Sequence, residues 1–196
     1  MREHDVPEWY IESCKKIKYM FPKGHAVAYV MMAMRIAWFK VYRPLAYYCA
    51  YFSVRAEDFD AGLILKGEDT VRTRLEELYA LGNAASNKEK NLITVLELAY
   101  ELYKRGLRFK GIDLYKSDGT RFLIEDGDVR PPINALVGIG ANAAASICEE
   151  ARKGEFISKE DLRTRCRVSR TVIETLEESG ALEGLSDTNQ ISLFSL

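Results

Sequence analysis

The stretch that most limits the possible folds of this chain runs from Leu136 to Ile147. In it Gly138 and Gly140 flank one apolar residue, Ile139. Glycine can take backbone angles that other residues avoid, so the isoleucine can enter a core while the chain turns tightly around it. The small residues Ala143–Ala145 follow and would let two helices approach closely. We therefore expect a helix to end here, a tight hairpin, and a new helix, which is a helix-hairpin-helix pattern.

The start of that second helix is a candidate phosphate site. The first N–H groups of a helix have no acceptor inside the helix, and the helix dipole makes this end positive. The absence of glycine side chains would also let a ligand come close to the backbone. Modules of this kind hold nucleic-acid backbones without reading bases. A plain turn between two helices explains the same residues, so the short pattern leaves both interpretations open.

Composition sets broad limits on the fold and the partners. The chain has 196 residues, of which 47% are hydrophobic and 29% charged, enough to form one large or two small units with a core. The net charge of −1 does not indicate a nucleic-acid binder. However, residues 1–55 carry nine Lys and Arg against four Asp and Glu, whereas residues 56–196 carry 19 against 25. The basic first part could face phosphates or could simply be solvated.

Cysteine usage and hydropathy indicate a cytoplasmic protein. The thiols are far apart without a C-x-x-C pair, and the chain has only two histidines, so we expect no metal site built from them. Buried thiols in a reducing compartment are the simpler interpretation. The polar N-terminus does not resemble a signal peptide, and the apolar stretch 26–34 is too short to span a bilayer. The four cysteines are Cys14, Cys49, Cys148 and Cys166.

Helical periodicity and capping signals predict a mainly α fold. The second expected helix is apolar nearly all round, which is typical of a buried helix, and its Arg35 would need a partner or a ligand. Ser86 and Glu89 form a predicted capping box. The helix expected at 5–20 has Asp5 or Val6 as its cap, and the one at 68–81 has Val71, Leu75, Leu78 and Tyr79 on one face. The other expected helices are 25–42, a stretch after Pro44, 87–105 before Gly106, the helix that ends near Lys153, one capped by Ser158 and one capped by Ser169.

Two short patterns interrupt the helices. Asp58-Phe59-Asp60 is a D-x-D sequence that could hold magnesium, but a loop capped by acids is the interpretation we favour. Between residues 107 and 130 the apolar period changes to two. Ile112 and Leu114 on one side, and Phe122 and Ile124 on the other, alternate with polar residues around Ser117-Asp118-Gly119. This pattern predicts a small β-hairpin with its turn at residues 117–119.

The last part of the chain combines a second helical pair with an unusual tail. The pair would pack beside the first helix-hairpin-helix, and its arginines could reach a phosphate backbone or occupy an exposed face. The tail from Ser186 is polar at first, and we expect this half to be mobile. Its final apolar side chains either enter a pocket on a partner or fold back onto the chain. The arginines are Arg163, Arg165, Arg167 and Arg170.

Two motifs in this sequence carry a family resemblance. Residues 190–194, Gln-Ile-Ser-Leu-Phe, resemble the pentapeptide by which bacterial replication proteins bind the sliding clamp, with Ile191 where the family usually has leucine. Residues 21–29 resemble the fingers signature of bacterial C-family replicative polymerases, with departures at Gly24 and Val27. Together with the order of the other motifs, the whole chain resembles the C-terminal region of the PolC-type alpha subunit of DNA polymerase III.

The resemblance implies a domain order and a polymerase context. Residues 1–106 would be a multi-helix fingers subdomain and 107–130 a β-hairpin connection. Residues 131–185 would form a tandem helix-hairpin-helix-like duplex-binding domain, followed by a flexible clamp-binding tail at 186–196. The palm with its metal-binding carboxylates lies outside this segment in the family. We therefore expect no catalytic or metal-binding residue here, Mg²⁺ bound elsewhere in the whole polymerase, and no nucleotide incorporation by this chain alone.

The resemblance also implies partners for single residues. The expected partners are dNTP, duplex DNA, the sliding clamp, and the remainder of the polymerase and replisome. A non-catalytic DNA- and clamp-binding module, or a structural helical fragment, are the alternatives. The implied dNTP-binding residues are Lys23, His25, Tyr29 and Arg35; the DNA-binding residues are Gly138, Ile139, Gly140, Ala141 and Asn142; the clamp-binding residues are Gln190, Ile191, Leu193 and Phe194.

Overall fold

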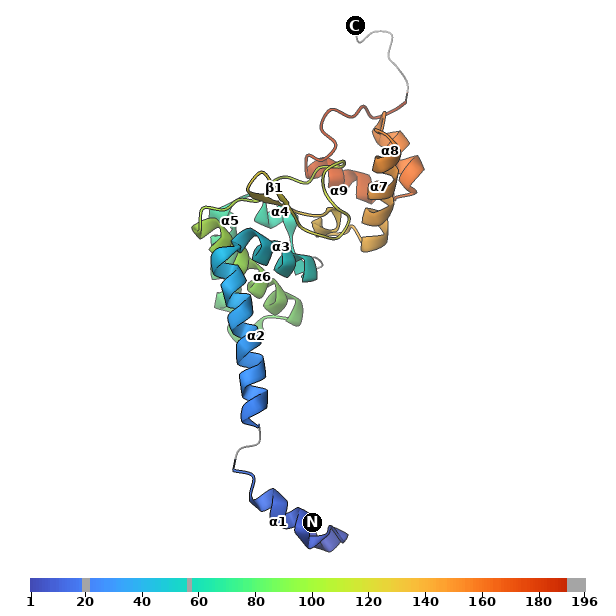
Figure 1. Cartoon of the computed structure of the whole chain (residues 1–196). Helices are drawn as coiled ribbons and strands as arrows, with labels where there is room; N and C mark the ends of the chain where they lie inside the picture. The colour runs from blue at the N-terminus through green and yellow to red at the C-terminus, as the bar shows by residue number, and fades with distance from the viewer. Residues whose placement is uncertain (19–21, 56–57, 190–196) are drawn as a thin grey trace. The chain divides into compact units, whose positions relative to one another are not determined.

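The computed structural model describes residues 1–18, 22–55 and 58–189 of the chain (Figure 1). The chain divides into two compact units, Met1–Tyr42 and Arg43–Leu196. Each unit is described by itself below.

The first unit begins with a short 3-10 turn, η1 (Arg2–His4), and helix α1 (Glu8–Lys15). The predicted cap at Asp5 or Val6 is wrong. Asp5 ends η1 with a left-handed backbone, φ 52°, and Pro7 is the extended residue that precedes α1. Proline has no N–H to contribute and a fixed φ, so it is well suited to the residue at which a helix begins.

Helix α2 (Lys23–Tyr42) has 20 residues and begins two residues before the predicted start. The prediction that this apolar helix is buried is wrong, because none of its described side chains is buried within the chain. Trp38 and Phe39 are each 50% exposed, and Met34 is 68% exposed. A helix of this length extends about 30 Å, and the eight residues of α1 are too few to cover such a surface.

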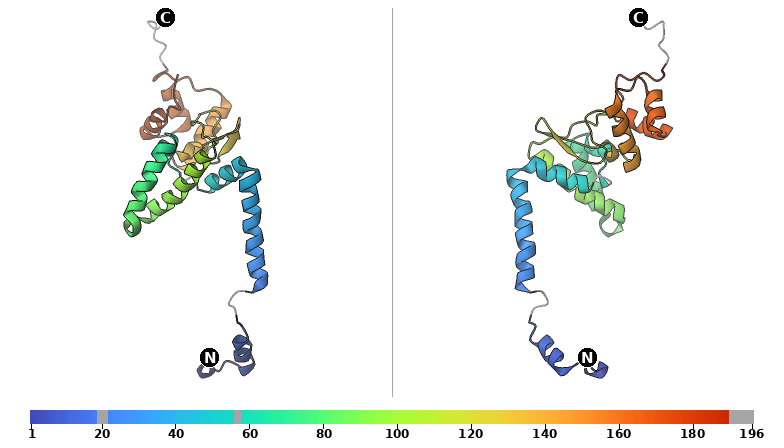
Figure 2. Two further views of the ribbon diagram at one scale, coloured as in Figure 1. Left: turned by 90° about the vertical axis from the view of Figure 1, so that its left-hand side faces the viewer. Right: turned by 45° about the vertical axis from the view of Figure 1, so that its right-hand side comes forward.

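The first half of the second unit is helical. The core-facing side of α5 carries Val71, Leu75 and Leu78, as predicted, but Tyr79 lies outside it and donates a hydrogen bond to Glu97 at 2.6 Å. Helices α5 and α6 lie side by side and are joined by a short turn (Figure 2). The bounds are α3 (Pro44–Val54), α4 (Ala61–Ile64), α5 (Glu68–Leu81), η3 (Gly82–Ala84) and α6 (Asn87–Lys104).

Both ends of α6 follow the sequence signals. The Ser86 hydroxyl accepts a hydrogen bond from the Glu89 amide, and the Glu89 carboxylate accepts one from the Ser86 amide, which confirms the capping box. Hydrogen bonds from the Ser86 hydroxyl and from the Ser86 amide to the Glu89 carboxylate hold the pKa of Glu89 below its ordinary value. At the far end the chain leaves the helix through Gly106, where φ is +75°. Such an angle favours glycine and ends the helix.

A two-stranded antiparallel hairpin follows, but its turn is not the predicted one. Strand β1 (Leu123–Glu125) pairs with β2 (Asp128–Arg130), with Ile124 opposite Val129. The turn is Asp126-Gly127, and both residues have positive φ, 52° and 84°. This two-residue turn matches the twist of paired strands, so it takes precedence over the predicted turn at 117–119. The region around Ile112 and Leu114 forms no strand.

Aspartate side chains explain why the predicted turn at 117–119 forms a loop instead. Asp113 accepts hydrogen bonds from the amides of Tyr115 and Lys116, and Asp118 accepts them from Thr120 and Arg121. Such local side-chain bonds give the backbone an alternative to a sheet ladder. The loop is anchored to the core by the buried side chains of Ile112, Leu114 and Phe122.

An aromatic cluster joins α3 to the hairpin region. The rings of Phe52 and Phe59 have centroids 5.3 Å apart, and that of Phe122 lies 4.8 Å from Phe59. The Phe122 amide donates to the Ser53 hydroxyl at 2.9 Å. This packing holds residues 58–60 in place, and these residues line a cavity.

The last described elements form the C-terminal helical group. Two helices begin where the sequence predicts, since the hydroxyls of Ser158 and Ser169 cap them. The prediction of a mainly α fold with one small β-hairpin is confirmed. Within residues 1–18, 22–55 and 58–189, no helix has the length and apolar character needed to cross a membrane. The bounds are η4 (Ile133–Ala135), α7 (Ala141–Lys153), α8 (Lys159–Cys166) and α9 (Arg170–Glu178).

Candidate nucleic-acid interface

The Gly138-Ile139-Gly140 segment forms a tight hairpin, which we call the first hairpin (residues 138–142). Ile139 is 4% exposed and enters the core, as predicted. Gly138 has φ +96°, an angle that L side chains rarely adopt. The element before the hairpin is a 3-10 turn, η4, instead of the predicted α-helix, because Pro131 and Pro132 leave only a few residues before the turn. The hairpin itself is confirmed.

The second glycine has a different role from the one expected. Gly140 has φ −72° and ψ 160°, which any residue can adopt, and it is the residue that precedes α7. It provides no side chain, so α7 begins without a side-chain cap. The first backbone bond into the helix joins the Ala144 amide to the Gly140 carbonyl at 3.0 Å. The amides of Ala141, Asn142 and Ala143 precede it and are available to an anion.

A loop from the β region supports the first hairpin from one side. The amides of Ile133 and Asn134 donate to the carbonyls of Asp118 and Gly119 at 2.9 and 3.1 Å. A Cβ at Gly119 would lie 3.3 Å from the Ala145 amide nitrogen, so only glycine fits this approach without displacement. Helix α7 is therefore approached closely by this loop at Ala144 and Ala145, and it also contacts α8.

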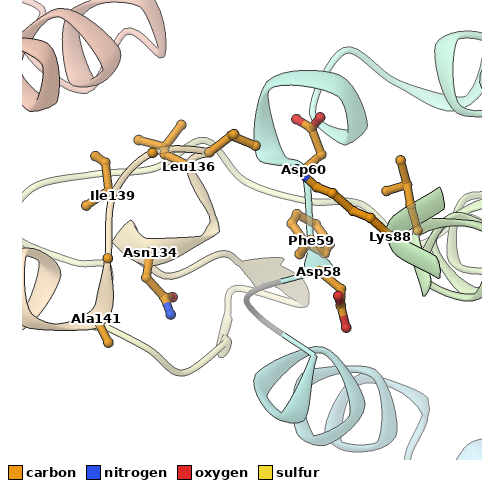
Figure 3. A pocket seen from close by; sticks show the side chains of 12 residues that line it. Asp58, Phe59, Asp60, Lys88, Asn134, Leu136, Ile139 and Ala141 are labelled. Carbon is orange, nitrogen blue, oxygen red and sulfur yellow. The ribbon is translucent and has the colours of Figure 1, made fainter. Parts of the chain in front are cut away.

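A cavity of about 480 Å³ lies between the first hairpin and the helical half of the second unit. Figure 3 shows the hairpin on one side, the 58–60 loop in the middle, and Lys88 reaching from α6 toward Asp60. A second cavity of about 310 Å³ shares Asp58, Asn134 and Ala141 with it and continues to Arg55. The lining residues of the first cavity are Asp58, Phe59, Asp60, Lys88, Leu92, Asn134 and 136–141.

The two aspartates beside this cavity are engaged in structural contacts. Asp60 caps α4, since its carboxylate accepts the Leu63 amide at 3.1 Å. Asp58 pairs with Arg55 at 3.3 Å and accepts a hydrogen bond from Asn91 at 3.4 Å. The interpretation as an acid-capped loop is therefore confirmed.

The same contacts bear on magnesium, which the family resemblance implies for the whole polymerase. In the described part of the chain, no three His, Cys, Asp or Glu side chains are placed to share a metal ion. The two carboxylates of the D-x-D sequence make separate contacts, Asp60 with the Leu63 amide and Asp58 with Arg55 and Asn91, and so do not converge on a common point for a catalytic ion.

A second hairpin, residues 167–170, joins α8 to α9 and repeats the backbone of the first. Arg167 has a left-handed backbone with φ 53°, in the place of Gly138. Val168 packs against the core, in the place of Ile139. Ser169 has φ −72° and ψ 163°, within a few degrees of Gly140, and also precedes a helix. Here, however, the Ser169 hydroxyl accepts a hydrogen bond from the Val172 amide at 3.3 Å. One of the free amides at the start of α9 is therefore already bonded.

The four arginines of this region do not form one cluster. Arg165 turns inward, where it pairs with Glu150 and Asp161 and donates to the carbonyls of Glu150, Gly154 and Glu155. Its guanidinium also lies over the Phe156 ring, 4.4 Å from the centroid. Arg165 therefore joins α7 to α8 and is not an available phosphate ligand. Arg163, Arg167 and Arg170 are exposed.

Two buried cysteine thiols lie on the helices that flank the hairpins. Cys148 on α7 and Cys166 at the end of α8 are buried, and burial raises the pKa of Cys166 to about 11. The pKa of Cys148 is also raised by burial. A thiol with a raised pKa is a poor nucleophile, so neither is a candidate reactive group.

The predicted mobility of the first half of the tail is wrong for residues 186–189, which bind to the start of α8. The Lys159 amide donates to the Ser186 carbonyl at 2.8 Å, and the Glu160 amide to the Asp187 carbonyl at 3.2 Å. The Ser158 hydroxyl bonds Asn189 at 2.6 Å, and Lys159 pairs with Asp187 at 2.7 Å. The predicted clamp-binding residues Gln190, Ile191, Leu193 and Phe194 lie outside the described residues.

The predicted nucleotide-binding residues all lie on α2 in the first unit. Lys23 is its first residue, and the rings of His25 and Tyr29 meet edge to face with centroids 5.5 Å apart. Arg35 lies 12 residues after Lys23, or about 18 Å along the axis, and contacts Met32 Sδ at 3.8 Å. Of the four residues, the structure brings His25 and Tyr29 into contact, whereas Lys23 and Arg35 lie toward opposite ends of the segment.

Sequence reasoning missed two parts of this interface. Lys88 lies about 50 residues before the first hairpin in the chain, and no sequence pattern connects the two. The second hairpin had a weak signal: an apolar residue followed by a small one, Val168-Ser169, placed like Ile139-Gly140. Without a glycine at Arg167 this signal could not be separated from an ordinary helix boundary.

Comparison with known proteins shows what the chain is similar to. The helix-hairpin-helix motif family matches residues 106–191. The chain is 65% identical over 194 residues to DNA polymerase III PolC-type of Clostridium perfringens, covering 99% of the chain and 13% of that protein. It is 56% identical to the Oceanobacillus iheyensis protein and 54% identical to the Bacillus subtilis protein of the same name, each over 99% of the chain and 14% of the relative. The chain thus spans about one seventh of the length of these relatives.

Proposed function

We propose that this chain, which is similar along almost its whole length to a segment of PolC-type DNA polymerase III, serves as the fingers and duplex-binding part of a cytoplasmic replicative DNA polymerase. In this role the first hairpin binds the backbone of duplex DNA, α2 contributes to binding of the incoming dNTP, and residues 190–194 bind the sliding clamp. The family resemblance and the helix-hairpin-helix match support this assignment.

The observation that carries duplex binding is the geometry of the first hairpin. Gly138 allows the sharp turn, the buried Ile139 fixes it to the core, and Gly140 leaves the amides of α7 uncapped. Backbone amides at a helix start bind phosphate oxygens without contacting bases. Such a grip is independent of sequence, which a polymerase needs as it moves, and it weakens with salt because counterions are released from DNA.

Substitution of Gly138 tests this role. A valine at φ +96° would distort the turn, so affinity for a fluorescent 20-base-pair duplex should fall by about tenfold or more, roughly 1.4 kcal/mol per tenfold. Gly106→Val is the matched control, because Gly106 also has a positive φ, +75°, but ends α6 away from the hairpin. Equal loss in both variants, or wild-type affinity in a folded Gly138→Val chain, would overturn the assignment.

The role proposed for α2 is to contact the triphosphate of the incoming nucleotide. Lys23 and His25 occupy the first turn of the helix, where positive groups and free amides favour phosphate oxygens. Tyr29 follows one turn later and could stack on a base, and Arg35 is a more distant candidate. In the whole polymerase, Mg²⁺ bound outside this segment would supply the charge needed for phosphoryl transfer.

A primer-extension assay separates the polymerase assignment from its alternatives for this chain. We expect no incorporation by the 196-residue chain, since the metal-binding palm is proposed to lie elsewhere in the polymerase. Sustained incorporation would place catalytic groups within the chain. Binding of duplex and clamp without incorporation is what a polymerase part and a non-catalytic module share. Restored synthesis on adding the remainder of the polymerase would identify the former.

Clamp binding is proposed for residues 190–194 on the strength of their sequence. A tether of this kind raises the effective concentration of a polymerase at its template and so gives processivity. Deletion of these residues should abolish binding to the bacterial sliding clamp in surface plasmon resonance while leaving duplex binding unchanged. Retained clamp affinity would remove this role from the tail.

A further inference from the structure

The cavity between the first hairpin and α6 is a binding feature that the hairpin alone does not explain. We propose that it is a second backbone subsite, which binds the deoxyribose and the phosphate adjacent to the phosphate held by α7, with Lys88 as its cation. This inference rests on the proposed function of the first hairpin and extends it to residues from the helical half of the second unit.

The position of the cavity makes it continuous with the hairpin. Residues 136–141, which include the first residue of α7, form one wall of the cavity (Figure 3). The opposite wall comes from the 58–60 loop and from Lys88 and Leu92 on α6. The aromatic cluster around Phe59 and the capping box at Ser86 hold this second wall in place.

The chemistry of the walls fits a sugar-phosphate backbone. Phe59, Leu92, Leu136 and Ile139 provide an apolar floor to the cavity, whose whole volume is about 480 Å³. The carbon faces of a deoxyribose are apolar, whereas its phosphates need cations or N–H donors. An apolar floor with a lysine at one side and a helix start at the other provides both kinds of contact. A site for a free metal ion or a purely apolar ligand would not combine them.

The charges around the cavity favour Lys88 as the phosphate ligand. Asp58 is paired with Arg55 and bonded to Asn91, and Asp60 directs one carboxylate oxygen to the Leu63 amide at the start of α4, so Asp60 remains the one unpaired charge opposite Lys88 among the described lining residues. Lys88 itself forms no ion pair within 4 Å with any of the described residues, and its side chain is exposed at the first turn of α6. A lysine of this kind can pair with a phosphate without first breaking a contact in the protein.

A buried polar atom lies where the two cavities adjoin. The side-chain oxygen of Asn134 is buried and has no hydrogen-bond partner among the described residues. Asn134 borders both the 480 Å³ cavity and the neighbouring 310 Å³ cavity, which also contacts Thr120 and Arg55. Buried polar atoms are rarely left without a partner, so a bound water beside the DNA backbone is expected to donate to this oxygen.

The test compares two lysines on one helix. Lys88→Ala should weaken binding of a 20-base-pair duplex roughly three- to tenfold, equally for several sequences, and should lower the slope of log affinity against log salt by about one. Lys90→Ala is the matched control, because Lys90 is two residues further on α6, lies on another face of the helix and does not border the cavity. Lys88→Arg should restore most of the lost affinity.

The outcomes separate this inference from the function on which it rests. If Gly138→Val abolishes duplex binding while Lys88→Ala and Lys90→Ala have equal, small effects, the hairpin binds DNA but the second subsite is wrong. If Gly138→Val leaves binding unchanged, the proposed function fails first. A third outcome is that Lys88→Ala weakens binding of a free deoxynucleoside monophosphate but leaves binding of the duplex unchanged. That result would assign the cavity to a mononucleotide and also overturn the inference.

Discussion

The two hairpins of the C-terminal helical group have nearly the same backbone but different side chains. Gly140 and Ser169 share φ −72° and differ by 3° in ψ, and each follows an apolar residue that packs into the core. Gly138 and Arg167 both have positive φ, +96° and +53°. The difference lies in the helix starts: α7 has no side-chain cap, whereas a serine hydroxyl occupies the third amide of α9.

This difference shows how one backbone can serve two purposes. A side-chain cap stabilises a helix, but it competes with any anion for the same amides. The first hairpin lacks the cap and keeps its amides available for a ligand. The second has the cap and carries exposed arginines, so any contact with DNA there would come from side chains. Substitutions in the two hairpins should therefore differ in their effects on stability and on DNA binding.

The largest effect is expected at the buried apolar residues. Ile139→Ala removes a side chain that is 4% exposed, so the free energy of unfolding should fall by about 2–4 kcal/mol. Val168 is only partly buried, and Val168→Ala should cost roughly 1 kcal/mol. Urea denaturation followed by circular dichroism measures both. Equal losses would mean that the two hairpins depend on the core to the same extent.

The next effect concerns the link between the two helix-hairpin units. Arg165→Met removes the ion pair and the carbonyl bond to Glu150 that join α8 to α7, together with the ion pair to Asp161 within α8 and the bonds to the carbonyls of Gly154 and Glu155 just after α7. It should lower the free energy of unfolding by roughly 1–3 kcal/mol. Arg163→Met, on the exposed side of α8, is the control and should change it by less than about 0.5 kcal/mol. A large effect of Arg163→Met alone would contradict the assignment of Arg165 as the link.

Exchanging residues at the two left-handed positions should have effects of different size. Gly138→Ala places a Cβ at φ +96° and should destabilise by about 1–2 kcal/mol. Arg167→Gly relieves a milder strain at φ 53° but makes the unfolded chain more flexible, so its net effect should lie within about 1 kcal/mol of zero. Thermal unfolding of both variants decides this, and a neutral Gly138→Ala would show that the first turn does not require glycine.

The smallest effect on stability is the most informative about function. Gly140→Ser copies the second hairpin into the first, and its Cβ would meet no atom within 4 Å. Because serine is a better cap than glycine, stability should rise by a few tenths of a kcal/mol. Duplex affinity should nevertheless fall, since the hydroxyl would occupy an amide proposed to bind phosphate. A variant that is both more stable and equally tight would contradict the role of the uncapped amides.

Local signals in the sequence were sufficient for most of the helices. The bounds of α5, the capping box of α6 and the serine caps of α8 and α9 follow from contacts within four residues, which a sequence pattern records. The turn of the β-hairpin was placed wrongly because Asp113 and Asp118 bind nearby amides, a competition that alternation does not reveal. The exposure of α2 was missed because periodicity reports hydrophobicity and not the available partner.

The candidate interface was predictable only in its local half. Gly138, Ile139 and Gly140 are neighbours in the chain, so their pattern indicates the hairpin directly. The cavity combines this hairpin with Asp58, which the Phe52–Phe59–Phe122 packing holds, and with Lys88, which the packing of α6 against α3 and α5 holds. Contacts at such sequence separations depend on the whole core, and one sequence without the fold does not specify them.

The attachment of residues 186–189 to α8 has a mechanical consequence. Each of the residues Ser186, Asp187 and Asn189 is bonded to Ser158, Lys159 or Glu160, so the polar stretch after α9 adds no free length to the chain. The described chain at Asn189 is therefore attached to the start of the helix that leads into the second hairpin. A partner bound just beyond Asn189 would pull on α8 itself, and force at that partner would be transmitted to the second hairpin without slack.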